Sequence, residues 1–118
     1  MDSNTVVNKS FAFAARVVEL YKWLTFSHKD LIISKQLLRC GTSIGANIAE
    51  AQHAQSRADF HAKMNIALKE ASETEYWLRL LYKTRYLTRN QFLSLHSDIS
   101  ELLRLLISIC KTTDHSAL

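Results

Sequence analysis

Basic and aromatic residues alternate in one stretch of the sequence and give its clearest chemical signal. No acidic residue occurs between Glu75 and Asp98. That interval contains four basic residues with tyrosines between them, namely Arg79, Tyr82, Lys83, Arg85, Tyr86 and Arg89. Guanidinium and ammonium groups bind phosphates, and tyrosine rings offer stacking faces to unpaired bases. The stretch therefore predicts a binding site for RNA or single-stranded DNA.

Lys35 and Arg39 form a second basic group, in a stretch without acids from residue 31 to residue 49. Their spacing of four places both on one helical face, and we expect them to extend the same phosphate-binding surface. A second interpretation stays open for the whole basic set. Cations near the end of a helix are favoured by its dipole, so the set is also typical of a solvated surface with Tyr82 in the core.

Catalytic and metal-binding signals are weak. Glu50 and His53 have the Glu-x-x-His spacing of di-iron and di-manganese helical sites, but no other histidine follows a glutamate by three residues. The glycine-containing run at residues 41–47 lacks the Lys-Ser/Thr ending of a phosphate loop. No nucleophile with an activating base accompanies these groups. We therefore expect no catalytic residue, no metal and no cofactor, so the chain is not predicted to be an enzyme.

Ser43, Asn47 and Glu50 form a polar row beside an apolar helical stripe. A buried polar group needs a hydrogen-bonding partner and so restricts how two helices align. The row is thus a candidate seam against the third helix or a neighbouring subunit. Plain solvation of these side chains is the alternative.

Long helices must position these residues. The 118 residues contain no proline and two glycines, which argues against a sandwich, a barrel or a disordered chain. A hydrophobic content of 47% suits one compact domain over residues 1–118. We find no secretory signal or membrane span, and two cysteines are too few for a disulfide framework, so we expect a cytoplasmic protein. The net charge of +4 is compatible with an anionic partner.

Periodicity and capping signals predict four helices, at about residues 10–26, 30–55, 57–85 and 89–113. Ser56 with Asp59 and Thr88 with Gln91 have capping-box spacing before the third and fourth helices. The third helix has apolar or small residues spaced alternately by four and three, as in helices packed along their length. Three short connections then predict an all-α, antiparallel, up-down-up-down four-helix bundle.

Small residues predict where two helices approach most closely. Gly41 and Gly45 lie in the middle of the second helix, and Ala67 and Ala71 lie in the middle of the third. Glycine inside a helix costs about 1 kcal/mol relative to alanine, which indicates a packing role. We therefore expect close contact between the second and third helices.

Two features of the sequence indicate a partner. The apolar residues of the fourth helix cover an arc of roughly 200°, wider than the ~100° that one core face needs. The predicted apolar stripe of the first helix consists of Ala14, Val17, Val18, Tyr21 and Leu24. Trp23 falls outside this stripe, near Arg16 and Glu19. A second subunit would cover both surfaces, although a partly covered surface tryptophan is an alternative explanation for Trp23.

Several segments resemble the bacterial four helix bundle protein family, also called the 23S rRNA intervening sequence protein family. The resemblance covers residues 10–24, 34–55 and 56–81. Its most specific pieces are TSIGANIAEA at residues 42–51 and ALKEASETEYWL at residues 67–78. It implies a four-helix bundle that assembles as a homopentamer. A related branch is the accessory variability determinant of diversity-generating retroelements, which binds nucleic acid and a reverse transcriptase.

The residues and the resemblance together predict a non-enzymatic, homo-oligomeric accessory protein that binds nucleic acid, with RNA favoured. Its binding residues would be Lys35, Arg39, Arg79, Lys83, Arg85 and Arg89. The alternative is an oligomeric scaffold for a polymerase-type protein that does not itself bind nucleic acid. No catalytic motif of the family exists to be carried over.

Overall fold

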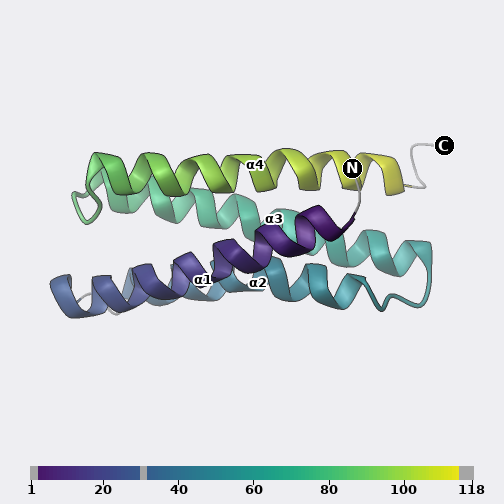
Figure 1. Cartoon of the computed structure of the whole chain (residues 1–118), viewed down its shortest axis with the longest axis horizontal. Coiled ribbons are helices and arrows are strands. Elements are labelled where there is room, and N and C mark those ends of the chain that lie inside the picture. Colours follow the sequence, from purple (N-terminus) through teal and green to yellow (C-terminus); the bar gives the residue numbers. More distant parts are fainter. Residues whose placement is uncertain (1–2, 30–31, 115–118) are drawn as a thin grey trace.

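The structure, a computed structural model, describes residues 3–29 and 32–114. These residues form four α-helices and no strand: α1 (Ser3–His28), α2 (Ile32–Ala51), α3 (Arg57–Lys83) and α4 (Arg89–Thr113). The helices run alternately up and down along a bundle with extents of 47 × 21 × 21 Å (Figure 1). The predicted all-α, antiparallel four-helix bundle is confirmed. None of the helices in the described ranges has the length and apolarity that a membrane span requires.

The helix boundaries differ from the prediction mainly in the first half of the chain. α1 begins at Ser3 instead of residue 10, because buried Val6 continues its apolar stripe by one more turn. α2 ends at Ala51, four residues before its predicted end at residue 55. Beyond Ala51, successive backbone hydrogen bonds from the N–H of residue i to the carbonyl of residue i−3 tighten the chain into a turn. The predicted start of this helix at residue 30 lies outside the described residues. α3 ends two residues early, and α4 matches its predicted range.

The two predicted capping pairs fix the starts of α3 and α4. Ser56 Oγ accepts a hydrogen bond from the Asp59 backbone N–H at 3.0 Å. The Asp59 carboxylate in turn accepts from the Gln55 backbone N–H and pairs with Lys63, and these contacts lower the pKa of Asp59. Thr88 and Gln91 form a complete capping box, with bonds of 3.1 and 2.9 Å. The local sequence therefore sets both helix starts.

One regular stripe from each helix builds the core. The stripe that the alternating spacing predicts in α3 is buried at six of its seven positions, Met64, Ala67, Ala71, Thr74, Leu78 and Leu81, whereas its first member, Phe60, is only half-buried. In α1 the buried face is centred one position from the predicted one and consists of Val6, Ser10, Phe13, Val17, Leu20 and Leu24. Ala14, Val18 and Tyr21, predicted to line that face, are only half-buried. Phe13 and Leu20, which the predicted stripe omitted, take the central positions.

The glycines of α2 face α1, so the predicted close contact with α3 at these residues is wrong. A Cβ atom on Gly41 would lie 2.9 Å from both methyl groups of Val17. A Cβ on Gly45 would lie 3.3 Å from the backbone oxygen of Ser10. The glycines remove the steric barrier to the first helix. The sequence indicated that Gly41 and Gly45 have a packing role, but it did not show which helix they approach.

The helix pairs α1–α2, α2–α3 and α3–α4 pack extensively, whereas α1 and α4 touch far less. Polar side chains bridge this fourth interface. Arg16 reaches both the Asp98 carboxylate, at 2.6 Å, and the Ser94 hydroxyl, at 2.8 Å. Lys9 pairs with Glu101 at 3.2 Å. Exposed polar contacts therefore help to close the bundle between its first and last helices.

Candidate nucleic-acid interface

The up-down topology brings the α1–α2 junction and the α3–α4 loop to the same end of the bundle (Figure 1). An aromatic contact joins the two connections. The His28 ring lies edge-on between Trp23 and Tyr86, with centroid distances of 5.2 and 5.0 Å. Residues that follow α1 and α3 are thus neighbours in space, although they are more than fifty positions apart in sequence.

Five of the six predicted binding residues lie toward this end of the bundle. Arg79 and Lys83 project from the last turns of α3, Arg85 is in the loop, and Arg89 is the first residue of α4. Lys35 lies in the first turn of α2. All five are exposed. None of them forms an ion pair with a carboxylate of the described residues.

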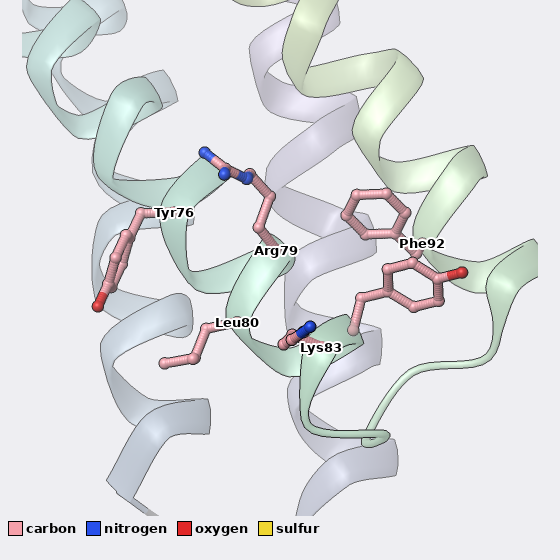
Figure 2. A pocket seen from close by; sticks show the side chains of 6 residues that line it. Tyr76, Arg79, Leu80, Lys83 and Phe92 are labelled. Atoms are coloured by element: carbon pink, nitrogen blue, oxygen red, sulfur yellow. The ribbon is translucent and has the colours of Figure 1, made fainter.

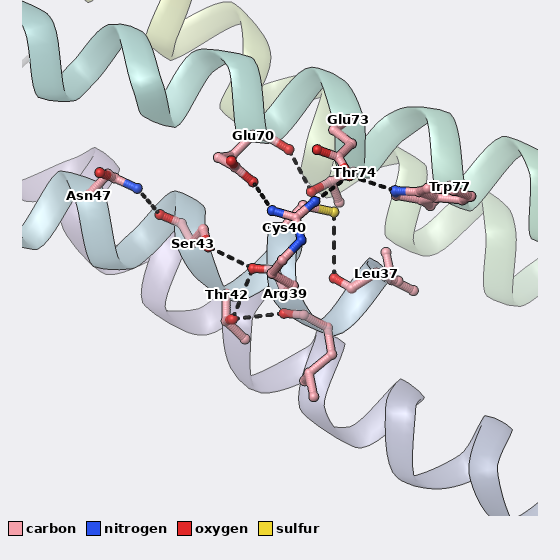
Figure 3. A network of polar contacts seen from close by, with 11 residues as sticks. Leu37, Arg39, Cys40, Thr42, Ser43, Asn47, Glu70, Glu73, Thr74 and Trp77 are labelled. Carbon is pink, nitrogen blue, oxygen red and sulfur yellow. Dashed lines mark hydrogen bonds and ion pairs between the residues drawn. The ribbon is translucent and has the colours of Figure 1, made fainter. Parts of the chain in front are cut away.

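Arg39 is different, because α3 already neutralises its charge. Its guanidinium pairs with Glu70 at 3.2 Å and with Glu73 (Figure 3). The hydrogen bond with Glu73 raises the pKa of Arg39. The Trp77 indole N–H and the Arg39 guanidinium together lower the pKa of Glu73. Sequence spacing put Arg39 with Lys35, but the tertiary contact assigns it to the α2–α3 interface, and we leave it out of the candidate surface.

Ion pairs are more frequent among the basic residues away from this end than among those at it. Away from the surface, the ion-paired basic residues of the described ranges are Lys9, Arg16, Lys22, Arg39 and Lys63. Within the described residues, no ion pair neutralises the cations gathered at the end, so their charges are available to a ligand. Basic residues without an ion pair in the described ranges also occur elsewhere. Lys69 and Arg104 lie on the middle parts of α3 and α4, and Arg57 and Lys111 lie at the opposite end of the bundle, where Arg57 donates to the Thr112 carbonyl at 3.0 Å.

The loop between α3 and α4 holds Arg85 in a strained conformation. The N–H of Tyr86 donates to the Leu81 oxygen at 2.8 Å, and the N–H of Arg85 donates to the Tyr82 oxygen at 3.1 Å. This is a Schellman motif, whose left-handed position usually holds glycine. Arg85 occupies it with a φ of 71°. The fold therefore displays an arginine at a position where glycine would be less strained.

Lys29, directly after α1, also has a left-handed backbone, and sequence reasoning missed it. Its φ is 56°, and within the described ranges Lys29 and Arg85 are the two non-glycine residues with a left-handed backbone. Lys29 directly follows His28, and Arg85 directly precedes Tyr86, the two residues whose rings are in contact. Lys29 was overlooked because an acidic residue follows it in the sequence. The polar turn between two predicted antiparallel helices could have placed it at this end.

We call the set Lys29, Lys35, Arg79, Lys83, Arg85 and Arg89 the basic end. Beside it is a hollow of about 710 Å³ that opens between α3 and the start of α4 (Figure 2). The hollow is lined by Tyr76, Arg79, Leu80, Tyr82, Lys83 and Phe92. The lining contains cations, aromatic rings and an aliphatic side chain but no acid. The two cations of the hollow can bind phosphates, and its aromatic and aliphatic side chains can contact apolar ring systems.

The predicted polar row on α2 makes its hydrogen bonds within the helix. Ser43 donates to the Arg39 carbonyl at 2.7 Å, and Asn47 donates to the Ser43 carbonyl at 2.8 Å (Figure 3). Glu50 is exposed. Within the described residues these side chains therefore do not form the seam with α3 that was one interpretation of the row. Local backbone bonding of Ser43 and Asn47 is the physical reason.

The described residues offer neither a metal-binding group nor a reactive thiol. The described residues contain no group of three or more His, Cys, Asp or Glu side chains arranged to hold a metal ion. Both cysteines are unpaired and buried. Burial raises the pKa of Cys40 to about 11 and raises that of Cys110, so both thiols stay protonated near neutral pH.

The surfaces predicted to meet a partner are partly covered within the chain. On α4, Leu103, Leu105 and Ile109 pack against the core, while Ile107 is exposed. Trp23 is 36% exposed and lines a second hollow of about 480 Å³ between α1 and α4. Arg16 and Glu19 lie beside it there, as the sequence suggested.

Comparison with known protein families and solved structures finds proteins similar to this chain. The profile of the 23S rRNA-intervening sequence protein family matches residues 2–108. A crystal structure from Bacteroides thetaiotaomicron, described as a protein of unknown function from the S23 ribosomal protein family, is 60% identical to the chain. It covers 90% of this chain and 98% of its own, with a TM-score of 0.88. No curated protein matches the chain.

Proposed function

The chain belongs to the 23S rRNA-intervening sequence protein family, and from this membership and its surface we propose that it is a non-enzymatic, homo-oligomeric nucleic-acid-binding accessory protein. The observation that carries the proposal is the basic end. There, six exposed cations from three helices and two connections converge without a carboxylate partner in the described residues. The family name refers to 23S rRNA, which favours RNA as the ligand.

Binding would proceed by neutralisation of phosphates. Each contact releases condensed counterions, so affinity falls steeply as salt concentration rises. Phosphates are the same in every sequence, so the basic end should bind with little sequence preference. The left-handed backbones at Lys29 and Arg85 support this role, because strained conformations are retained at functional positions.

Oligomerisation would strengthen the binding. The exposed Ile107 and the half-exposed Trp23 provide apolar surface for a second copy of the chain. We propose a homopentameric ring, which would repeat the basic end around its circumference. A nucleic acid that reaches two or more copies gains avidity without any new contact. We place the protein in the cytoplasm, where its two unpaired cysteines would remain reduced.

Charge reversal at the basic end tests the proposal directly. The double variant Arg85→Glu, Arg89→Glu should abolish binding of a labelled oligouridine in fluorescence anisotropy while keeping the helical circular dichroism spectrum. Lys69→Glu with Arg104→Glu is the matched control, since it reverses two exposed cations on the middle of α3 and α4. Equal binding by the native protein and the basic-end variant would remove this surface from the mechanism.

Size exclusion with light scattering tests the assembly. We expect an oligomer whose 260/280 nm absorbance ratio falls after a high-salt wash. A monomer free of nucleic acid would contradict both the ring and the avidity mechanism.

An oligomeric scaffold for a polymerase-type protein is the second candidate. The hollow beside Trp23 and the exposed Phe11 and Phe26 of α1 favour it, since apolar surface is typical of protein interfaces. Such a complex would resist salt and would form equally well with the Arg85→Glu, Arg89→Glu variant. Loss of the complex in Trp23→Ala, with oligonucleotide binding absent from the native protein, would support the scaffold over the first proposal.

A further inference from the structure

Three aromatic rings from α3 and α4 form a stack that ends beside the basic end. Tyr82 lies nearly parallel to Phe92, with centroids 4.4 Å apart and planes inclined by 10°. Phe92 stacks in turn on His96 at 5.0 Å. Nε2 of His96 lies 2.9 Å from a carboxylate oxygen of Glu75, which ties this end of the stack to α3. The other end is Tyr82, which remains 38% exposed.

The stack forms one side of the hollow between α3 and α4. Tyr82 and Phe92 both line it. Figure 2 shows Tyr76 and Phe92 on opposite sides of Arg79 and Lys83, so the two cations stand between aromatic groups. Tyr76 is 56% exposed and lies edge-on to Trp77. The hollow thus combines exposed ring surface with two unpaired positive charges.

This combination does more than neutralise phosphates. A duplex presents its phosphates outward and keeps its bases paired and stacked inside, so aromatic side chains on the protein surface cannot reach the base faces. A single strand can turn a base outward onto such a ring, with a gain of about 1–3 kcal/mol per base. Tyr82 is already oriented by the parallel contact with Phe92, so little side-chain freedom remains to be lost on binding.

Resting on the nucleic-acid-binding function proposed above, we propose that the hollow takes an unpaired base of a single strand. The base stacks on the exposed ring of Tyr82, and Arg79 and Lys83 bind the phosphates on its two sides. The ligand class is therefore single-stranded nucleic acid in preference to duplex. RNA and DNA share this chemistry, so oligouridine and oligothymidine form separate arms of the test.

The test compares Tyr82→Leu with the native protein. Leucine keeps apolar cover over Phe92 but has no ring face. Anisotropy with labelled single strands of about 12 nucleotides, within the usual site size, should show an affinity loss of about tenfold. A duplex of the same length should bind the native and Tyr82→Leu proteins equally. Tyr82→Phe is the matched control and should bind single strands as the native protein does, because the ring is kept.

Crosslinking gives a readout that does not depend on affinity. A single strand containing bromouridine should attach to Tyr82 on irradiation, as mapped by mass spectrometry. Native affinity of Tyr82→Leu for both single strands, with binding lost in Arg85→Glu, Arg89→Glu, would overturn the stacking proposal and leave the proposed function standing. Absence of binding to every oligonucleotide by the native protein would overturn both. Loss with oligouridine alone, or with oligothymidine alone, would support stacking and identify which of the two nucleic acids the hollow takes.

Discussion

The His28 ring at the end of α1 contacts the Tyr86 ring of the α3–α4 loop edge-on, with centroids 5.0 Å apart. This contact joins the two connections at one end of the bundle. It also sets side by side the two left-handed residues of the described chain, Lys29 and Arg85. Both carry a positive charge at a position that favours glycine. The relationship leads to a prediction in which stability and binding change in opposite directions.

Replacing Lys29 or Arg85 with glycine should stabilise the fold and weaken binding. A left-handed non-glycine residue costs about 1–2 kcal/mol, and the greater freedom of unfolded glycine offsets about 0.4–1 kcal/mol of the relief. We expect a net gain of about 0.5–1 kcal/mol per site in urea unfolding. Lys29→Ala and Arg85→Ala are the controls, since they remove the charge but keep the strain. Equal stability of the glycine and alanine variants would contradict the strain argument.

Gly41→Ala should destabilise the bundle although alanine is the better helix former. The new methyl would lie 2.9 Å from the methyl groups of buried Val17. Overpacking costs about 1–3 kcal/mol, against a gain of about 1 kcal/mol in helix propensity. We expect a net loss of about 1 kcal/mol in the free energy of unfolding.

A double-mutant cycle with Val17→Ala tests the cause of that loss. Truncation of Val17 leaves room for the added methyl, so the double variant should be more stable than the sum of the single changes predicts, by about 1 kcal/mol. Additive effects would show that Gly41 and Val17 do not meet in this way.

The thiols should be unreactive in the folded protein. Thiolate is the reacting form, and burial raises the pKa of Cys40 to about 11 from an ordinary value of 9.0. A disulfide reagent at pH 8 should therefore modify Cys40 only after addition of denaturant, and Cys110, which is 8% exposed, should react first. Cys40→Ala identifies which thiol reacts. Fast labelling of native Cys40 would contradict its burial.

The ion pair of Arg39 with Glu73 should make stability depend on acid. The pKa of Glu73 is lowered in the folded state by Trp77 and Arg39, so its contribution is fully present above the unfolded value of 4.5. That contribution is lost as the pH falls through the lowered folded value. The urea midpoint should therefore drop below about pH 4.5, and Glu73→Gln should reduce the dependence.

Glu19→Gln is the control for this measurement, because Glu19 is exposed and its ion-pair partner in the described part of the chain is Lys22 on its own helix. It should leave the acid dependence unchanged. The same acid profile in Glu73→Gln and the native protein would show that other carboxylates carry the effect.

The helical architecture could be predicted because its determinants are local. Capping pairs such as Thr88 with Gln91 act within one turn, and the alternating spacing of the α3 stripe depends only on the helical period. These signals remain the same whichever helices lie beside them. The fold class and the start of the third and fourth helices therefore follow from the sequence alone.

The site was only partly predictable, because a charge acquires its role from its neighbours in space. The acid-free interval marked Arg79, Lys83, Arg85 and Arg89, and the fold places no carboxylate of residues 3–29 and 32–114 in ion-pair contact with them. Arg39 was indistinguishable from Lys35 in sequence until Glu70 and Glu73 were placed opposite it on α3. Coulombic pairing acts over a few ångströms, and spacing along one helix cannot report which side chains a second helix brings within that range.

The same limit explains the errors in packing. A packing role for Gly41 and Gly45 could be predicted from their positions, since glycine inside a helix is otherwise costly. The folded bundle shows that their neighbour is α1 and not α3. It also shows that Lys29 joins Arg85 at one end, and that Tyr82 is the exposed ring of a three-ring stack. Local sequence fixes the helix and its faces, whereas rotation and neighbour choice depend on how all four helices fill one core together.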